Sequence, residues 1–110
     1  MNIDWKKIEK ECPKSYEKIL VYLNNIPGDY IICYCDLEKF FDENGIIINI
    51  NKNYICKPDN VDFEYYKNSW NYNIIIQDKI PYYQHTILHS RDEAKLEAVY
   101  KAFEIMEKLL

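Results

Sequence analysis

The last stretch of the chain, SRDEAKLEAVYKAFEIMEKLL (90–110), is the feature that most constrains the fold, because it has the full pattern of an amphipathic helix. Ser90 and Glu93 stand at the spacing of a capping box, in which each side chain satisfies a backbone N–H at the helix start. The apolar positions form one broad stripe, made of Leu96, Ala98, Val99, Ala102, Phe103, Ile105, Met106, Leu109 and Leu110. We therefore expect this helix to lie flat on a sheet or on another helix.

The first part of the chain has the same period, but it is interrupted. Apolar residues recur at helical spacing at Ile8, Cys12, Tyr16, Ile19, Leu20 and Leu23. Pro13 suits the first turn of a helix and disfavours helix at the residue before it. The pattern predicts a short helix, a break near Cys12, and a second helix that ends at about Asn24.

The segment from Tyr30 to Gly45 begins ambiguously and then becomes clear. YIICYC (30–35) is compatible with a strand or with a helix face. DLEKFFDENG predicts a short helix that Asp36 caps and Gly45 ends, with Leu37, Phe40 and Phe41 as its apolar residues.

Alternating patterns in the middle of the chain predict strands. GIIINI (45–50) places Ile46, Ile48 and Ile50 on one face of a predicted strand. YIC (54–56) is expected to pair back after a turn at NKN. WNYNIIIQ (70–77) alternates most regularly, and PYYQHTILH (81–89) is expected to pair with it. We predict one α+β domain over residues 1–110, with two layers: an antiparallel sheet of three or four strands, and the N-terminal and C-terminal helices packed on one face.

The composition is that of a globular protein and weighs against two classes. Apolar residues make up 48% of the 110 residues and charged residues 29%. No apolar run reaches the roughly 18–20 residues of a membrane span, and the start lacks the apolar stretch of a signal peptide, so we expect a cytoplasmic protein. The net charge of −4, with Arg91 as the single arginine, weighs against nucleic acid as a partner.

Cysteine and histidine are the residues that metal or nucleophilic chemistry would use. In a reducing cytoplasm the cysteines are expected to be free, small core residues: Cys12, Cys33, Cys35 and Cys56. His85 and His89 are four apart in a predicted strand, about 13 Å from each other, which is too far for one ion. We therefore expect no metal and no cofactor. A small cysteine- or zinc-dependent enzyme is kept as an alternative.

Aromatic residues in a polar connection predict a binding surface. Phe63, Tyr65 and Tyr66 stand in the long polar segment DFEYYKNSW, and Tyr82 and Tyr83 stand at the start of a predicted strand. Tyrosine gives a large and stiff contact area at little entropic cost, which is typical of interfaces. We expect these five residues to contact a protein or a small ligand, or to form a homodimer face.

Four pieces of the sequence together resemble small uncharacterised phage- and prophage-type proteins. They are CPKSYEKILVYL, LEKFFDENGIIINI, WNYNI and SRDEAKLEAVYKAFEIMEKL, which together cover 51 of the 110 residues in the same order. The resemblance implies a non-enzymatic accessory protein of a mobile element in the cytoplasm of the host cell. Such a protein would contact a host protein or capture a small ligand, for example in counter-defence.

The order helix, strands, helix, with SRDEAKLEAVYKAFEIM opening the last helix, is similar to a double-stranded RNA-binding domain. The resemblance implies that Arg91 and Lys95 would contact phosphates across a groove. Asp92 and Glu93 lie between them and remove most of the basic character of this helix start. RNA binding is therefore the alternative to protein binding.

Overall fold

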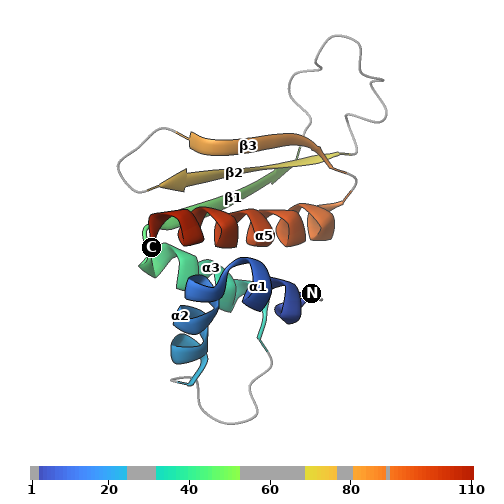
Figure 1. Ribbon diagram of the computed structural model, residues 1–110. Helices are drawn as coiled ribbons and strands as arrows, with labels where there is room; N and C mark the ends of the chain where they lie inside the picture. Colours follow the sequence, from blue (N-terminus) through green and yellow to red (C-terminus); the bar gives the residue numbers. More distant parts are fainter. Residues whose placement is uncertain (1–2, 25–31, 53–68, 77–80, 89) are drawn as a thin grey trace.

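The computed structural model describes residues 3–24, 32–52, 69–76, 81–88 and 90–110, and of residues 81–87 only the backbone. The elements are α1 (Trp5–Glu11), α2 (Pro13–Asn24), α3 (Tyr34–Glu43), β1 (Ile46–Lys52), β2 (Trp70–Ile76), β3 (Pro81–Leu88) and α5 (Arg91–Leu109) (Figure 1). They form an α+β fold, which confirms the predicted class.

The described strands form one antiparallel sheet in the order β1-β2-β3. β1 pairs with β2 in continuous register along its whole length. The pairing of β2 with β3 contains two register shifts, one next to Trp70 and one next to Ile74. The predicted strand YIC (54–56) lies outside the described residues.

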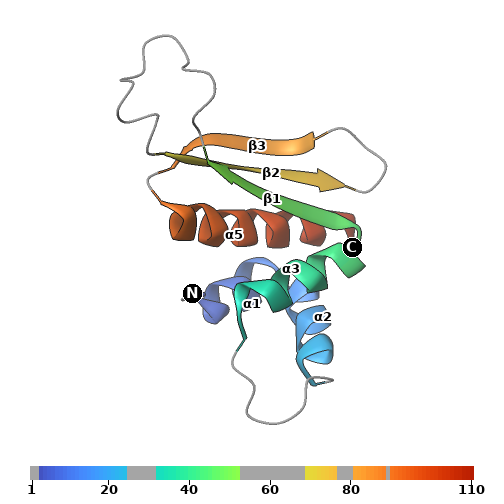
Figure 2. The ribbon, with the colours of Figure 1, turned by 180° about the vertical axis from the view of Figure 1, so that it is seen from behind.

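α5 lies in the middle of the molecule. It packs against the sheet on one side and against α1, α2 and α3 on the other, so all described helices lie on one side of the sheet (Figures 1 and 2). The main neighbours of α1 and α2 are each other and α5, which makes a further layer beyond the two that were predicted. The apolar stripe of α5 is broad enough to pack in two directions. The buried part of this stripe ends at Met106, since Leu109 and Leu110 are 56% and 43% exposed.

An aromatic cluster joins the helices around the middle of α5. Phe103 is fully buried, and its ring centroid lies 4.9 Å from that of Phe41 and 6.1 Å from that of Trp5, both edge to face. Phe40 lies 5.3 Å from Phe41 and 5.4 Å from Tyr22. Edge-to-face pairs are favourable beyond the area that they bury. Residues from α1, α2, α3 and α5 thus share one core.

The helix ends follow most of the predicted signals. α1 ends at Cys12 and α2 begins at Pro13, so the predicted break is confirmed. The hydroxyl of Ser90 accepts a hydrogen bond from the backbone N–H of Glu93 at the start of α5. Gly45 follows α3 with a φ of 80°, in the left-handed region that favours glycine.

The start of α3 differs from the prediction. Tyr34 and Cys35 lie in the first turn of the helix, which settles that part of the ambiguous segment as helix. The N-cap residue is Cys33 rather than Asp36. Asp36 instead reaches back, and its Oδ2 accepts a hydrogen bond of 2.9 Å from the backbone N–H of Cys33. Asp36 therefore takes the place that Glu or Gln has in a capping box, because it stands three residues after the cap.

Candidate functional site

The face of the sheet that points away from α5 is the main candidate for a functional surface. The even-numbered residues of β1 and β2 point to α5 and include Ile46, Ile48, Tyr72 and Ile74, which are buried. The odd-numbered residues point the other way, where no described element covers them (Figure 2). We call this surface the outer sheet face, and it consists of Ile47, Asn49, Asn51, Asn71, Asn73 and Ile75.

The outer sheet face is organised in rows that cross from β1 to β2. Asn49 lies opposite Asn73, and its Nδ2 donates a hydrogen bond of 3.0 Å to the Oδ1 of Asn73. Asn51 lies opposite Asn71 in the next row. A carboxamide group both donates and accepts hydrogen bonds and carries no charge. These rows therefore offer a neutral hydrogen-bonding surface.

An apolar row borders the amide rows. Ile47 lies opposite Ile75, and Ile47 is 38% exposed. The outer sheet face is thus apolar at one end and polar in the middle. Uncharged polar groups next to apolar groups are typical of surfaces that bind proteins.

The structure does not test the five predicted aromatic contact residues. Phe63, Tyr65 and Tyr66 fall outside the described residues, and only the backbone of Tyr82 and Tyr83 is described. That backbone pairs with β2, and Tyr83 lies opposite Ile74. Contact through the five aromatic residues therefore stays a prediction.

The two basic residues of the RNA alternative are brought close to aromatic rings. The guanidinium carbon of Arg91 lies 5.8 Å from the ring centroid of Trp70, and Nζ of Lys95 lies 5.0 Å from that of Tyr34. Burial, and then the nearby Glu38 carboxylate, raise the pKa of the Tyr34 hydroxyl well above its ordinary value. Tyr34 therefore stays neutral, and both cations lie within the distance of a cation–π contact.

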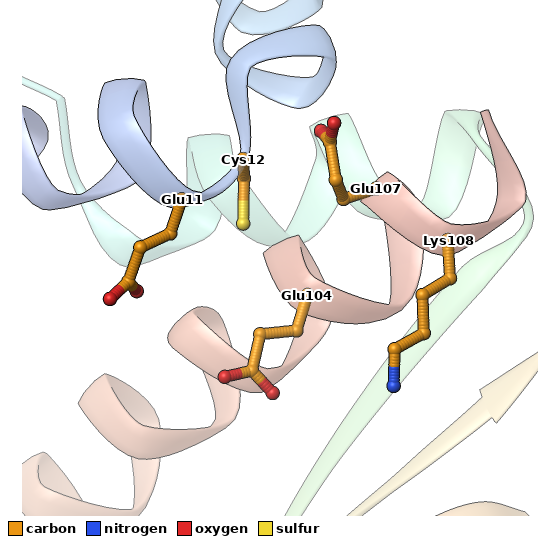
Figure 3. A pocket seen from close by; sticks show the side chains of 5 residues that line it. All are labelled: Glu11, Cys12, Glu104, Glu107 and Lys108. Atoms are coloured by element: carbon orange, nitrogen blue, oxygen red, sulfur yellow. The ribbon is translucent and has the colours of Figure 1, made fainter.

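A pocket of about 420 Å³ lies between the end of α1 and the last turns of α5, lined by Glu11, Cys12, Glu104, Glu107 and Lys108 (Figure 3). The thiol of Cys12 is buried. Burial, and then the carboxylates of Glu107, Glu104 and Glu11, raise its pKa. A nucleophilic cysteine needs its thiolate form, which these surroundings disfavour.

The carboxylate of Glu107, which lines this pocket, connects α5 with the start of α2. Glu107 accepts hydrogen bonds from the backbone N–H of Ser15 at 2.9 Å and of Lys14 at 3.4 Å, and from the Ser15 hydroxyl at 3.1 Å. The side chain of Glu107 thus satisfies the N–H groups at the start of α2 from the far end of the chain. Burial acts to raise the pKa of Glu107, but these hydrogen bonds outweigh it and lower the pKa.

The other cysteines differ from the expectation of small core residues. Cys33 and Cys35 are exposed at the start of α3, and only Cys12 is buried among the cysteines that the structure describes. Sγ of Cys33 donates a hydrogen bond of 3.2 Å to Oδ2 of Asp36, so this thiol belongs to the helix cap. Within the described ranges no group of three His, Cys, Asp or Glu side chains is arranged to hold a metal ion.

Sequence reasoning missed the outer sheet face, although its signal was present. The asparagines of β1 and β2 alternate with inward-facing apolar residues in both strands, which assigns them to one face.

Comparison with protein-family models, with curated proteins and with solved structures finds no match to this chain. No helix among the described residues is both long and apolar enough to cross a membrane.

Proposed function

We propose that this chain is a non-enzymatic binding protein that contacts a partner protein through the outer sheet face. The observation that carries the proposal is the one-sided arrangement of the helices. They cover the inner face of the sheet, whereas the outer face presents amide rows and an isoleucine pair to solvent in the part of the chain that the structure describes. A flat, uncharged surface suits a protein partner better than a small molecule, which favours a concave pocket.

The roles of the polar side chains on the helical side support a binding role over a catalytic one. Glu107 caps α2, Asp36 completes the cap of α3, and Ser90 caps α5. A general acid or base has to be free to reach a substrate proton. These groups are already bound to backbone N–H donors, whereas Asn49 and Asn73 on the outer sheet face are hydrogen-bonded to each other.

The predicted aromatic residues stand next to these strands in the sequence. Phe63, Tyr65 and Tyr66 belong to the segment that connects β1 with β2, and Tyr82 and Tyr83 belong to β3. We infer that these five residues add to the contact with the partner protein. The resemblance to phage and prophage proteins supports an accessory role in the cytoplasm of a host cell, with a host protein, for example one of a defence system, as the partner.

The test is a capture experiment with matched lysine substitutions. Asn73→Lys places a charge in the middle of the outer sheet face, where an unpaired charge is costly to bury. Asn24→Lys makes the same change at an exposed position at the end of α2, on the helical side. The wild-type chain and Asn24→Lys should retain the same host protein, and Asn73→Lys should lose it. Equal capture by all three chains would contradict the proposal.

The aromatic part of the surface is tested separately. Replacing Tyr65 and Tyr66 together by alanine should abolish capture, because these rings are expected to supply much of the contact area. Circular dichroism shows whether the variant keeps its fold. Unchanged capture by the folded variant would remove the aromatic residues from the interface and leave the outer sheet face to be judged by Asn73→Lys.

Duplex RNA binding is a second candidate, favoured by the placement of Arg91 and Lys95 beside Trp70 and Tyr34. Cations together with aromatic rings are typical of nucleic-acid contacts. A mobility shift that weakens steeply with salt, and that is lost when both cations are replaced by alanine, would support it. The absence of any shift at low salt would exclude it, because phosphate contacts are strongest there.

A further inference from the structure

β1 is an edge strand among the strands that the structure describes, since β2 is its one neighbour in the sheet. Along an edge, every second residue directs its backbone N–H and C=O away from the sheet. β1 is seven residues long and pairs with β2 without any bulge, so the edge that it presents among the described strands is regular. The predicted strand YIC (54–56), which would compete for this edge, lies outside the described residues. Such an edge is a template for another strand.

The two edges of the sheet differ in how they are protected. β3 begins with Pro81 and pairs irregularly with β2, and both proline and bulges blunt an edge against further pairing. β1 has neither of these features. It carries no charge from Ile46 to Asn51, and Lys52 is its one charged residue. The β1 edge is therefore the one that is suited to pairing.

The uncharged central part of β1, residues 47–51, is complementary to itself. We propose that β1 of a second copy of this chain pairs with β1 in antiparallel orientation, about a two-fold axis at Asn49. In this register all seven residues of the strand are paired. Ile48 then lies opposite Ile50 of the second copy on the inner face, and Ile47 lies opposite Asn51 of the second copy on the outer face. The two Asn49 side chains meet at the axis, and opposite residues share a face as antiparallel pairing requires.

This pairing joins the two sheets in the order β3-β2-β1-β1-β2-β3. The Asn49–Asn73 amide pair of each copy then becomes part of one row of four amides across the axis. Two-fold, self-complementary contacts are the commonest basis of homodimers. The inference goes beyond the proposed function, because the dimer forms whether or not the outer sheet face binds a partner.

Lysine substitutions at the axis and away from it test the pairing. Asn49→Lys places two like charges directly opposite each other, which destabilises a strand pair. Asn73→Lys removes the same Asn49–Asn73 hydrogen bond but sits one strand further from the axis, and Asn24→Lys lies on the helical side. Sedimentation velocity over a dilution series should show a wild-type dimer. Asn49→Lys should raise its dissociation constant about tenfold or more, and the two controls should change it by less than about threefold.

The loss in Asn49→Lys should diminish at high salt, because screening weakens the repulsion. A wild-type chain that stays monomeric at the highest concentration reached, or equal dissociation constants for all variants, would overturn the proposal. The readout is oligomeric state, so it is independent of partner capture. A monomer that still captures its partner through the outer sheet face would remove the dimer and leave the proposed function standing.

Cross-linking tests the register without relying on a charged variant. In a chain with Cys33, Cys35 and Cys56 replaced by serine, Asn49→Cys should be joined to its copy by a short bismaleimide. Asn51→Cys should not, because the two residues 51 would lie about 13 Å apart. Cross-linking that is equal at both positions, or absent at both, would overturn the pairing about Asn49.

Discussion

The two faces of the sheet carry opposite chemistry on the same strands. On the inner face Ile46 and Ile74 are 1% and 0% exposed, and they pack against α5 and its neighbouring helices. On the outer face the adjacent Ile47 is 38% exposed, and amides occupy most of the remaining positions. Hydrophobic burial accounts for the isoleucines of the inner face, but it does not require rows of asparagine on the outer one. Folding therefore accounts for the inner face, and the proposed binding function would account for the outer one.

The largest effect that would test this contrast comes from one pair of adjacent residues. Ile74→Ala should lower the free energy of unfolding by about 2–5 kcal/mol, because it leaves a cavity in a fully buried site. Ile75→Ala, on the outer face beside it, should cost only about 1 kcal/mol, because its side chain is partly exposed already. Urea denaturation followed by circular dichroism measures both values. Equal losses would mean that the outer sheet face is covered in the folded chain.

The contrast between buried and exposed positions also explains which parts of the structure could be predicted from the sequence. Apolar periodicity depends on burial, so it located α5 and the inner isoleucines of β1, and Pro13 located the break at Cys12. The second packing direction of α5 was not predictable, because a broad stripe does not say which elements will cover it. Local capping chemistry was partly missed: Cys33 caps α3, although cysteine is not a preferred capping residue and Asp36 three positions later is the stronger signal.

The candidate site was less predictable than the fold. The aromatic residues Tyr65 and Tyr66 are conspicuous in the sequence, because rings are unusual in a polar segment, whereas asparagines in a strand give no comparable signal. Asn49 and Asn73 are 24 positions apart, and only the strand register brings them within hydrogen-bond distance. A sequence gives the face on which each residue lies, but the register that aligns two strands depends on tertiary packing.

A smaller difference in the free energy of unfolding should distinguish polar groups that stabilise the fold from those that remain available for binding. Ser15 is fully buried, and its hydroxyl bonds to Glu107 and lies 3.4 Å from the backbone carbonyl of Phe103. Ser15→Ala should therefore cost about 1–2 kcal/mol, because buried partners lose a donor. Asn73→Ala should cost about 0.5 kcal/mol or less, because its amide pair is accessible to water. Thermal or urea unfolding of the two variants checks the order, and a greater loss for Asn73→Ala would make the amide rows structural.

The smallest expected effect is on the pH dependence of the free energy of unfolding, and it concerns the helices below the inner face of the sheet. The pKa of Glu107 is lowered from its usual 4.5 in the folded chain by hydrogen bonds from Ser15 and Lys14, which overcome the opposing effect of burial. A carboxyl group with a lowered folded-state pKa contributes stability above its unfolded pKa, and this contribution is lost as the pH falls through the folded value. The free energy of unfolding should thus fall below about pH 4.5, and part of that fall should disappear in Glu107→Gln.

The matched control for this pH dependence is Glu104→Gln, on the same helix and in the same pocket. Glu104 is half-exposed and pairs with Lys101 at 3.2 Å rather than with the start of α2. Its variant should follow the wild-type profile in acid, because the N–H groups of Ser15 and Lys14 keep their acceptor. If Glu107→Gln also followed the wild-type profile, the cap of α2 would not depend on the charge of Glu107. The helical side would then be held together by apolar packing alone, like the inner face of the sheet.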